Sequence, residues 1–200
     1  MDKGAGPDIV TNNDNQILDV VRSGNSRAYA VLVDRHKEKA MTLAVRMLGS
    51  REEAEEIVQD AFLKAYKNLD QFRGDAKFST WLYRILYNLC ITRVTRRKGK
   101  METLDPEEDL SRETTISEDI SVQERMEHEE LKGLMVSEIE KLPAKLKSVV
   151  LLFYIQEMSY EEISTVTNTP LGSIKTYLHR GRNLLRKRLV GQLNGEVTAS

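Results

Sequence analysis

A basic helical face near the C-terminus is the part of the sequence whose chemistry is easiest to define. At about 100° per residue, the segment 171–190 places apolar side chains on one arc and polar ones on the other. It contains six Lys or Arg residues and no acidic residue. A face of one sign attracts phosphates, whereas a merely solvated helix usually carries mixed charges. The segment therefore indicates contact with nucleic acid.

The residues just before this segment favour a helix-turn-helix motif. Ser159 and Glu162 have the spacing of a capping box and predict a short helix. Asn168 and Thr169 predict the turn, with Thr169 as N-cap of the next helix and Pro170 at its first position. The second helix of such a motif enters the major groove. The candidate DNA-contacting residues are Pro170, Gly172, Ser173, Lys175, Thr176, Tyr177, His179, Arg180 and Arg182.

A second chemical pattern lies on the helix predicted over residues 78–98. This segment is apolar around most of its circumference, so we expect it at the buried centre of the first half of the chain. A polar stripe with a period of four residues breaks the pattern, and Trp81 lies beside it. Stacking and phosphate contacts on such a stripe could hold unstacked bases, and the loop 73–79 could capture a flipped base. The candidate residues are Lys77, Phe78, Ser79, Trp81, Arg84, Asn88, Thr92, Arg96 and Arg97.

A third candidate surface lies on the helix predicted from Ser50 to about residue 72. Its apolar half should pack inward. On the polar half, Leu63 stands among charged and amide side chains. One exposed leucine requires no explanation, but in this setting it could anchor a contact with another protein. The candidate set is Glu56, Gln59, Asp60, Leu63 and Lys64.

Each of these patterns has a structural alternative. The basic helix could simply pack on a core, with Tyr177 buried, and Trp81 could be an ordinary core residue. Two positions of the basic helix already stand out: Arg188 falls on the apolar arc, and Gly181 could permit close packing of helices.

Charge divides the chain, although the net charge is only −1. Residues 15–100 hold 17 basic and 10 acidic groups, residues 101–124 hold one and nine, and residues 125–190 hold 11 and eight. We therefore expect an all-α fold of two small helical domains joined by an acidic flexible linker, the second domain being the helix-turn-helix. Residues 1–14 should be a flexible N-terminus and residues 191–200 a tail.

The sequence supports neither enzyme chemistry nor a metal site. It has no phosphate-binding loop, nucleophile elbow, dinucleotide fingerprint or histidine-rich metal spacing. The single Cys90 excludes an internal disulfide and fits a reducing cytoplasm, and we expect it in the core. No apolar run approaches a membrane span or a signal peptide. We expect a cytoplasmic protein with no catalytic residues, cofactor or metal.

Three motifs, in this order, resemble the extracytoplasmic-function (ECF) group of bacterial sigma factors over nearly all of residues 15–190. Residues 53–66 are similar to the helix that grips the clamp of core RNA polymerase. Residues 78–88 are similar to the promoter-melting segment, and residues 142–182 to the helix-turn-helix that reads the upstream promoter element. Thr92 departs from the usual Asp of the family, and Gly181 from the common Ala.

The resemblance implies a transcription initiation factor that binds core RNA polymerase, recognises the −10 and −35 elements and promotes melting. The three candidate sets would then be the polymerase-binding, −10 and −35 surfaces. The implied partners are the β′ clamp and β flap of core polymerase, promoter DNA in double- and single-stranded form, and an anti-sigma factor, without direct membrane insertion. The alternative is a helix-turn-helix repressor or activator that binds DNA without core polymerase.

Overall fold

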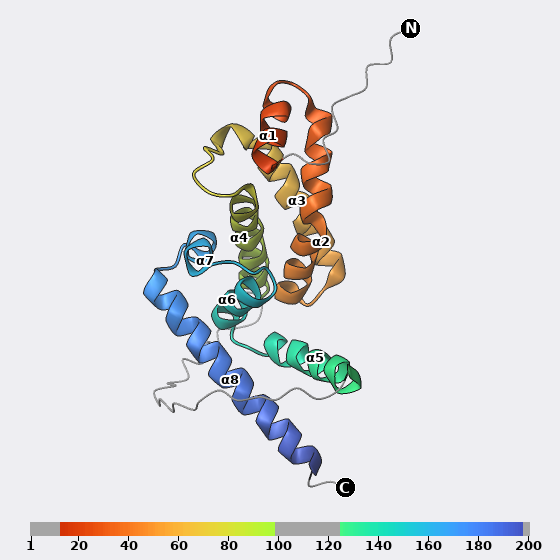
Figure 1. Ribbon diagram of the computed structural model, residues 1–200, viewed down its shortest axis with the longest axis vertical. Coiled ribbons are helices and arrows are strands. Elements are labelled where there is room, and N and C mark those ends of the chain that lie inside the picture. The colour runs from red at the N-terminus through yellow and green to blue at the C-terminus, as the bar shows by residue number, and fades with distance from the viewer. Residues whose placement is uncertain (1–12, 99–124, 198–200) are drawn as a thin grey trace.

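The computed structural model describes residues 13–98 and 125–197, and every regular element in these ranges is a helix (Figure 1). The N-terminal group comprises α1 (Asp14–Arg22), α2 (Tyr29–Leu48), α3 (Arg51–Lys67) and α4 (Phe78–Lys98), with short 3₁₀ turns at Ser26–Ala28 and Leu69–Gln71. The C-terminal group comprises α5 (Arg125–Glu140), α6 (Ala144–Tyr154), α7 (Tyr160–Thr167) and α8 (Leu171–Val197). The all-α prediction is confirmed. The acidic segment 101–124 lies outside the described residues, as do residues 1–12.

Side chains at the helix ends satisfy backbone groups that would otherwise lack partners. The Ser50 side chain accepts a hydrogen bond from the backbone N–H of Glu53 and starts α3. Ser159 and Glu162 form the reciprocal capping box that the sequence predicts for α7. Gly49 ends α2 with φ at 70°, a left-handed conformation that a residue without Cβ adopts at little cost.

Two helix ends differ from the prediction. The helix α3 ends at Lys67 instead of near residue 72, and a 3₁₀ turn replaces its last part. Thr169 is not the N-cap of α8, and its hydroxyl donates to the carbonyl of Thr167 at 3.3 Å. The Pro170 carbonyl accepts the first helical bond instead, from the N–H of Ile174 at 3.1 Å, so α8 begins one residue later.

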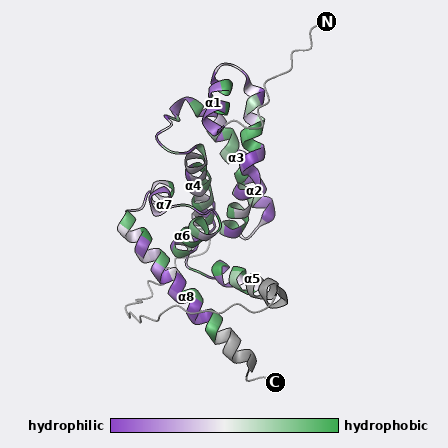
Figure 2. Ribbon diagram, viewed as in Figure 1, coloured by the Kyte–Doolittle hydropathy of each residue, from purple (hydrophilic) through white to green (hydrophobic). Residues whose placement is uncertain are grey.

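One apolar core continues through both groups of helices. Figure 1 shows α4 in the middle, with α2 and α3 on one side and α7 on the other, and α4 contacts all three. Leu82, Leu86 and Cys90 on α4 are fully buried, as expected for a central helix. Burial raises the pKa of the Cys90 thiol to about 12. In Figure 2, hydrophilic residues alternate with hydrophobic ones along α8, which lies at the surface.

The polar side chain on the apolar arc of α8 has a buried partner. Nη1 of Arg188 lies 3.9 Å from a carboxylate oxygen of Glu138, which is 2% exposed. Nζ of Lys141 lies 2.5 Å from the other oxygen. Arg188 therefore adds a second positive charge beside the buried carboxylate of α5.

Gly181 brings α8 unusually close to α6. A Cβ at this position would lie 2.7 Å from Cγ2 of Val150, a contact that real side chains do not make. Val150 is 1% exposed and β-branched, so it has little room to rotate away. The close packing expected at Gly181 is confirmed.

Gly181→Ala is therefore expected to lower the free energy of unfolding by about 1 kcal/mol. An overpacking cost of ~1–3 kcal/mol outweighs the gain of about 1 kcal/mol in helix propensity. Urea unfolding followed by circular dichroism measures the effect. Gly133→Ala is the matched control, because nothing lies within 4 Å of a Cβ there, and it should stabilise the protein. A second substitution, Val150→Ala, should relieve the clash; a Gly181→Ala protein as stable as the wild type would contradict this account.

Candidate nucleic-acid interface

The helix-turn-helix presents the polar arc of α8 to solvent. Asn168, with φ at 53°, ends α7 in the left-handed conformation and turns the chain into α8. The opposite arc is buried through Ile174, Leu178 and Leu185. Ser173 and Tyr177 are half-buried at the edge of the core. The other predicted DNA-contacting residues are exposed: Pro170, Gly172, Lys175, Thr176, His179, Arg180 and Arg182.

Three aromatic side chains hold Arg182. Its guanidinium lies 5.7 Å from the ring centre of Phe153 and 5.9 Å from that of Tyr154. Nη2 also donates to the hydroxyl of Tyr160 at 3.4 Å. These rings lie 22 to 29 residues before Arg182, so helical periodicity could not reveal them. They fix the direction of a charge that remains exposed and able to contact a phosphate.

An aromatic cluster anchors the loop at the start of α4. Phe72 and Phe78 lie at its two ends, with ring centres 6.0 Å apart, and Trp81 lies 5.3 Å from Phe72. Phe78 is 1% exposed and is a core residue in this conformation, whereas Trp81 is half-buried. Between the anchors, Gly74 has φ at 80°. A cavity of about 660 Å³ lies between this loop and α7.

Arg22 is a loop-positioning residue that the sequence did not reveal. Its Nη2 donates to the carbonyl of Leu69 at 3.2 Å and to that of Phe72. Its guanidinium also lies 6.0 Å from the Phe72 ring centre. These partners are 47 and 50 residues away in the sequence, so only the fold brings them together. Arg22 thus fastens the entrance of the loop to the end of α1.

The polar stripe of α4 is exposed along its length, from Arg84 through Asn88 and Thr92 to Arg96. The Thr92 hydroxyl donates to the Asn88 carbonyl at 2.8 Å, so it is committed to its own helix. Arg97 forms an ion pair with Glu53 and donates to the Leu48 carbonyl at 2.9 Å. In this structure, Arg97 therefore ties the end of α4 to the corner between α2 and α3.

At the other end of α4, two predicted −10 residues face α7. Lys77 lies with its Nζ 3.0 Å from Oε1 of Glu162, and Ser79 beside it is half-buried. The hydroxyl of the buried Thr80 donates to the same carboxylate oxygen at 3.4 Å. Burial alone would raise the pKa of Glu162, but the Ser159 backbone hydrogen bond and the nearby Lys77 keep the pKa lower than usual. The carboxylate is therefore ionised and paired at neutral pH.

The predicted protein-binding surface of α3 borders an apolar groove. Glu56, Gln59, Asp60 and Lys64 are exposed, and Leu63 is 50% exposed. Gln59 and Leu63 line a groove of about 1200 Å³ between α2 and α3. Its other wall comes from α2 and includes Val33, Met41 and Val45, which the sequence did not mark as part of the surface.

One predicted residue of this surface, Glu56, already has a partner within the N-terminal group, because its carboxylate accepts a hydrogen bond from Arg93 of α4 at 3.1 Å.

Within the described residues, no group of three or more His, Cys, Asp or Glu side chains could hold a metal ion. Over the same residues, none of the helices has the length and apolar character that a membrane crossing requires.

Two family models match the chain. Sigma-70 region 2 matches residues 32–100, and Sigma-70, region 4 matches residues 133–185. The chain is 42% identical over 174 residues to the ECF RNA polymerase sigma factor SigW of Bacillus subtilis (strain 168), covering 84% of this chain and 92% of that protein.

Two solved structures share the fold. CnrH in complex with the cytosolic domain of CnrY has a TM-score of 0.65 at 24% identity, over 90% of this chain and 99% of that one. The sigma factor RpoE in complex with the anti-sigma factor NepR from Bartonella quintana has a TM-score of 0.61 at 19% identity, over 80% of this chain and 96% of that one.

Proposed function

Because this chain belongs to the ECF sigma factors, which are transcription initiation factors and not enzymes, we propose that its three exposed surfaces divide the steps of initiation. The α2–α3 groove binds core RNA polymerase. The stripe of α4 and the loop before it open the −10 element, and α8 reads the −35 element. The observation that carries this proposal is the exposed polar arc of α8, which has no acidic residue over residues 171–190 and belongs to the second helix of a helix-turn-helix. Residues 15–100 then act as sigma region 2 and residues 125–190 as sigma region 4.

The same surfaces suggest which parts of the polymerase and which forms of DNA each group of helices contacts. The apolar groove of the N-terminal group suits the β′ clamp, and the C-terminal group is assigned to the β flap. Duplex DNA contacts α8, whereas separated strands contact α4. A fold relative is named as a complex with an anti-sigma factor, which supports an inhibitor of this kind for the present chain. Binding to core polymerase would place the protein in the cytoplasm.

In-vitro transcription with core polymerase on genomic fragments tests the function as a whole. We expect defined start sites only when both this chain and core enzyme are present. A repressor or activator would instead bind its operator alone. Tight, sequence-specific binding by the chain without core enzyme, with no new start sites, would support that alternative.

Reading of the −35 element predicts different outcomes for two cations of α8. If Lys175 reads a base, Lys175→Ala should cost ~1–3 kcal/mol of binding free energy and change sequence preference. If Arg182 contacts a phosphate, Arg182→Ala should weaken all sites evenly and lower the salt slope by about one. Holoenzyme binding to promoter fragments at several salt concentrations measures both.

Lys145→Ala, at an exposed position of α6, is the control and should leave affinity and salt slope unchanged. The assignment of α8 fails if Lys175→Ala and Arg182→Ala behave like this control.

A further inference from the structure

Arg182 directly follows the glycine at which α8 and α6 come closest. A Cβ at Gly181 would lie 2.7 Å from Cγ2 of Val150, so no side chain of α8 separates the two helices here. One residue further along α8, the Arg182 side chain reaches the last turn of α6, where Phe153 and Tyr154 lie. The close approach of the helices therefore brings an exposed cation onto two aromatic rings.

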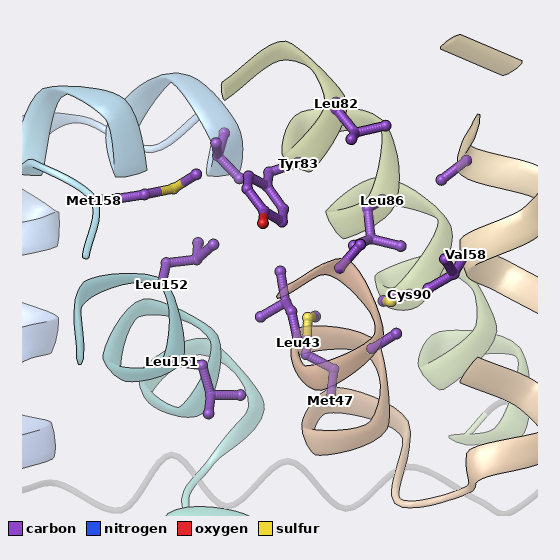
Figure 3. Packing of buried hydrophobic residues seen from close by; sticks show 14 of the residues in the cluster. Leu43, Met47, Val58, Leu82, Tyr83, Leu86, Cys90, Leu151, Leu152 and Met158 are labelled. Carbon is purple, nitrogen blue, oxygen red and sulfur yellow. The ribbon is translucent and has the colours of Figure 1, made fainter. Parts of the chain in front are cut away.

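The last turn of α6 passes from the core to the surface within four residues. Leu151 and Leu152 are buried, and Figure 3 shows both among the hydrophobic residues of the core. Phe153 is half-buried, and Tyr154 is 47% exposed. Because successive residues of a helix point about 100° apart, this sequence of burial turns the chain outwards step by step. Tyr154 therefore belongs to a helix that is anchored in the core, while its ring lies at the surface beside α8.

The aromatic rings around Arg182 support one another. The rings of Phe153 and Tyr154 lie 4.9 Å apart between their centres, at an interplanar angle of 85°. Phe153 also lies 5.4 Å from the ring centre of Tyr160, the first residue of α7. Edge-to-face contacts of this kind are favourable for aromatic pairs. The three rings thus form one cluster, contributed by α6 and α7, that holds a side chain of α8.

The aromatic cluster holds Arg182 without neutralising its charge. Arg93 shows the alternative, because its Nη2 lies 3.1 Å from a carboxylate oxygen of Glu56, which compensates the charge. A ring attracts a guanidinium through its π face, so the N–H groups in the guanidinium plane stay available. Of these, only Nη2 donates within the cluster, to the Tyr160 hydroxyl at 3.4 Å. The remaining donors suit a phosphate, which arginine binds through two parallel N–H groups.

Tyr154 differs from the other two rings in its contacts. Phe153 and Tyr160 pack against the apolar core, whereas Tyr154 is not among the residues that do so. Its recorded ring contacts are with Phe153 and with the guanidinium of Arg182. An exposed tyrosine whose ring faces an exposed arginine therefore contributes to the orientation of that arginine more than to the stability of the core.

We propose that Tyr154 is a positioning residue for recognition of the −35 element, and that it holds Arg182 in the orientation that meets a DNA phosphate. The proposal rests on the assignment of α8 to the −35 element. An arginine that is already held loses less rotamer freedom on binding than one that moves freely. Tyr154 therefore strengthens binding evenly at all promoter sequences, and it adds no charge of its own.

Binding of the complete holoenzyme to promoter fragments at several salt concentrations tests this role. Tyr154→Leu should weaken binding about threefold at every sequence, because the cation–π contact is lost. The salt slope should stay unchanged, since Arg182 keeps its charge. Tyr154→Phe keeps the ring and should restore the affinity. Ile155→Ala is the matched control, because it removes an exposed apolar side chain at the same helix end, and it should bind as the wild type does.

A double-mutant cycle distinguishes positioning from a general structural role. In the Arg182→Ala protein, the further change Tyr154→Leu should have no effect, because the side chain that Tyr154 positions is absent. A threefold loss that persists in this background would overturn the proposal, since Tyr154 would then act on the fold or on DNA directly. Tyr154→Leu with wild-type affinity, or Tyr154→Phe as weak as Tyr154→Leu, would overturn it as well.

The holding of Arg182 can also be measured without DNA or polymerase. Nitrogen relaxation of the Arg182 Nε–H group in the full chain should show restricted motion in the wild type and in Tyr154→Phe, and a lower order parameter in Tyr154→Leu. Equal order parameters in all three proteins would refute the proposal. If Arg182→Ala holoenzyme binds promoters as the wild type does, the proposed function of Arg182 fails instead, and the relaxation measurement still decides whether Tyr154 holds it.

Discussion

Simultaneous replacement of Gln59 and Leu63 by alanine is expected to weaken binding to core RNA polymerase by at least tenfold, while the helix content stays unchanged. Both side chains line the groove between α2 and α3, and Leu63 is half exposed on its rim. An apolar groove of this kind suits a partner helix whose apolar residues insert between α2 and α3. Loss of an apolar anchor together with its neighbouring amide should cost about 1.4 kcal/mol or more, which corresponds to at least tenfold in affinity.

Co-elution and quantitative binding to core enzyme measure this loss. Lys67→Ala is the matched control, because it lies exposed on the same helix but does not line the groove. Met41→Asp, on the opposite wall, should weaken binding as well if the whole groove is used. Unchanged co-elution of the Gln59→Ala/Leu63→Ala protein would show that polymerase binds elsewhere.

The second large effect is expected from Arg84→Ala and Asn88→Ala on the stripe of α4. Both side chains are exposed, so their removal leaves the core intact. Extruding a base costs a few kcal/mol, and stacking on an aromatic returns ~1–3 kcal/mol per base, so contacts to the separated strand must supply the rest. Each variant should reduce the permanganate-reactive thymines of the open complex about tenfold, with core binding and −35 binding unchanged.

A template with a pre-melted bubble distinguishes a defect in DNA melting from a defect in protein folding. It should restore transcription by both variants, because its strands are already separated and the step that needs the stripe is bypassed. Trp81→Ala would not serve here, since Trp81 packs on Phe72 and Phe78 and its loss would disturb the core. If the bubble does not rescue properly folded Arg84→Ala and Asn88→Ala proteins, the stripe is structural and melting belongs to other residues.

The sequence predicted the features that depend on neighbours within a few residues. The capping box of Ser159 and the two arcs of α8 both follow from local bonding or helical period. The cap at Thr169 was predicted wrongly, because the first helical bond goes to the carbonyl of Pro170 and Thr169 therefore lies one residue before the cap position. Roles of the candidate DNA- and polymerase-contacting residues stay predictions.

Features formed by distant segments could not be read from the sequence. The second wall of the groove comes from α2, and periodicity does not tell which helix packs beside α3. In the sequence, Arg22 is an ordinary charged residue at a helix end. Only the fold brings it to the Leu69 and Phe72 carbonyls, at the entrance of the loop before α4. Contacts between the two groups of helices join residues up to 117 positions apart, as in the bond from Gln156 to Lys39.

Glu162 divides its two oxygen atoms between different helices. Oε2 accepts from the Ser159 N–H at the start of α7, whereas Oε1 faces Lys77 and Thr80 of the N-terminal group. Its mutational tolerance is therefore narrow and uneven: Gln can retain the cap but not the charge, and Asp is too short to reach both sides. A change selected at this position would therefore alter both the contact between the two groups of helices and the start of α7, the first helix of the helix-turn-helix.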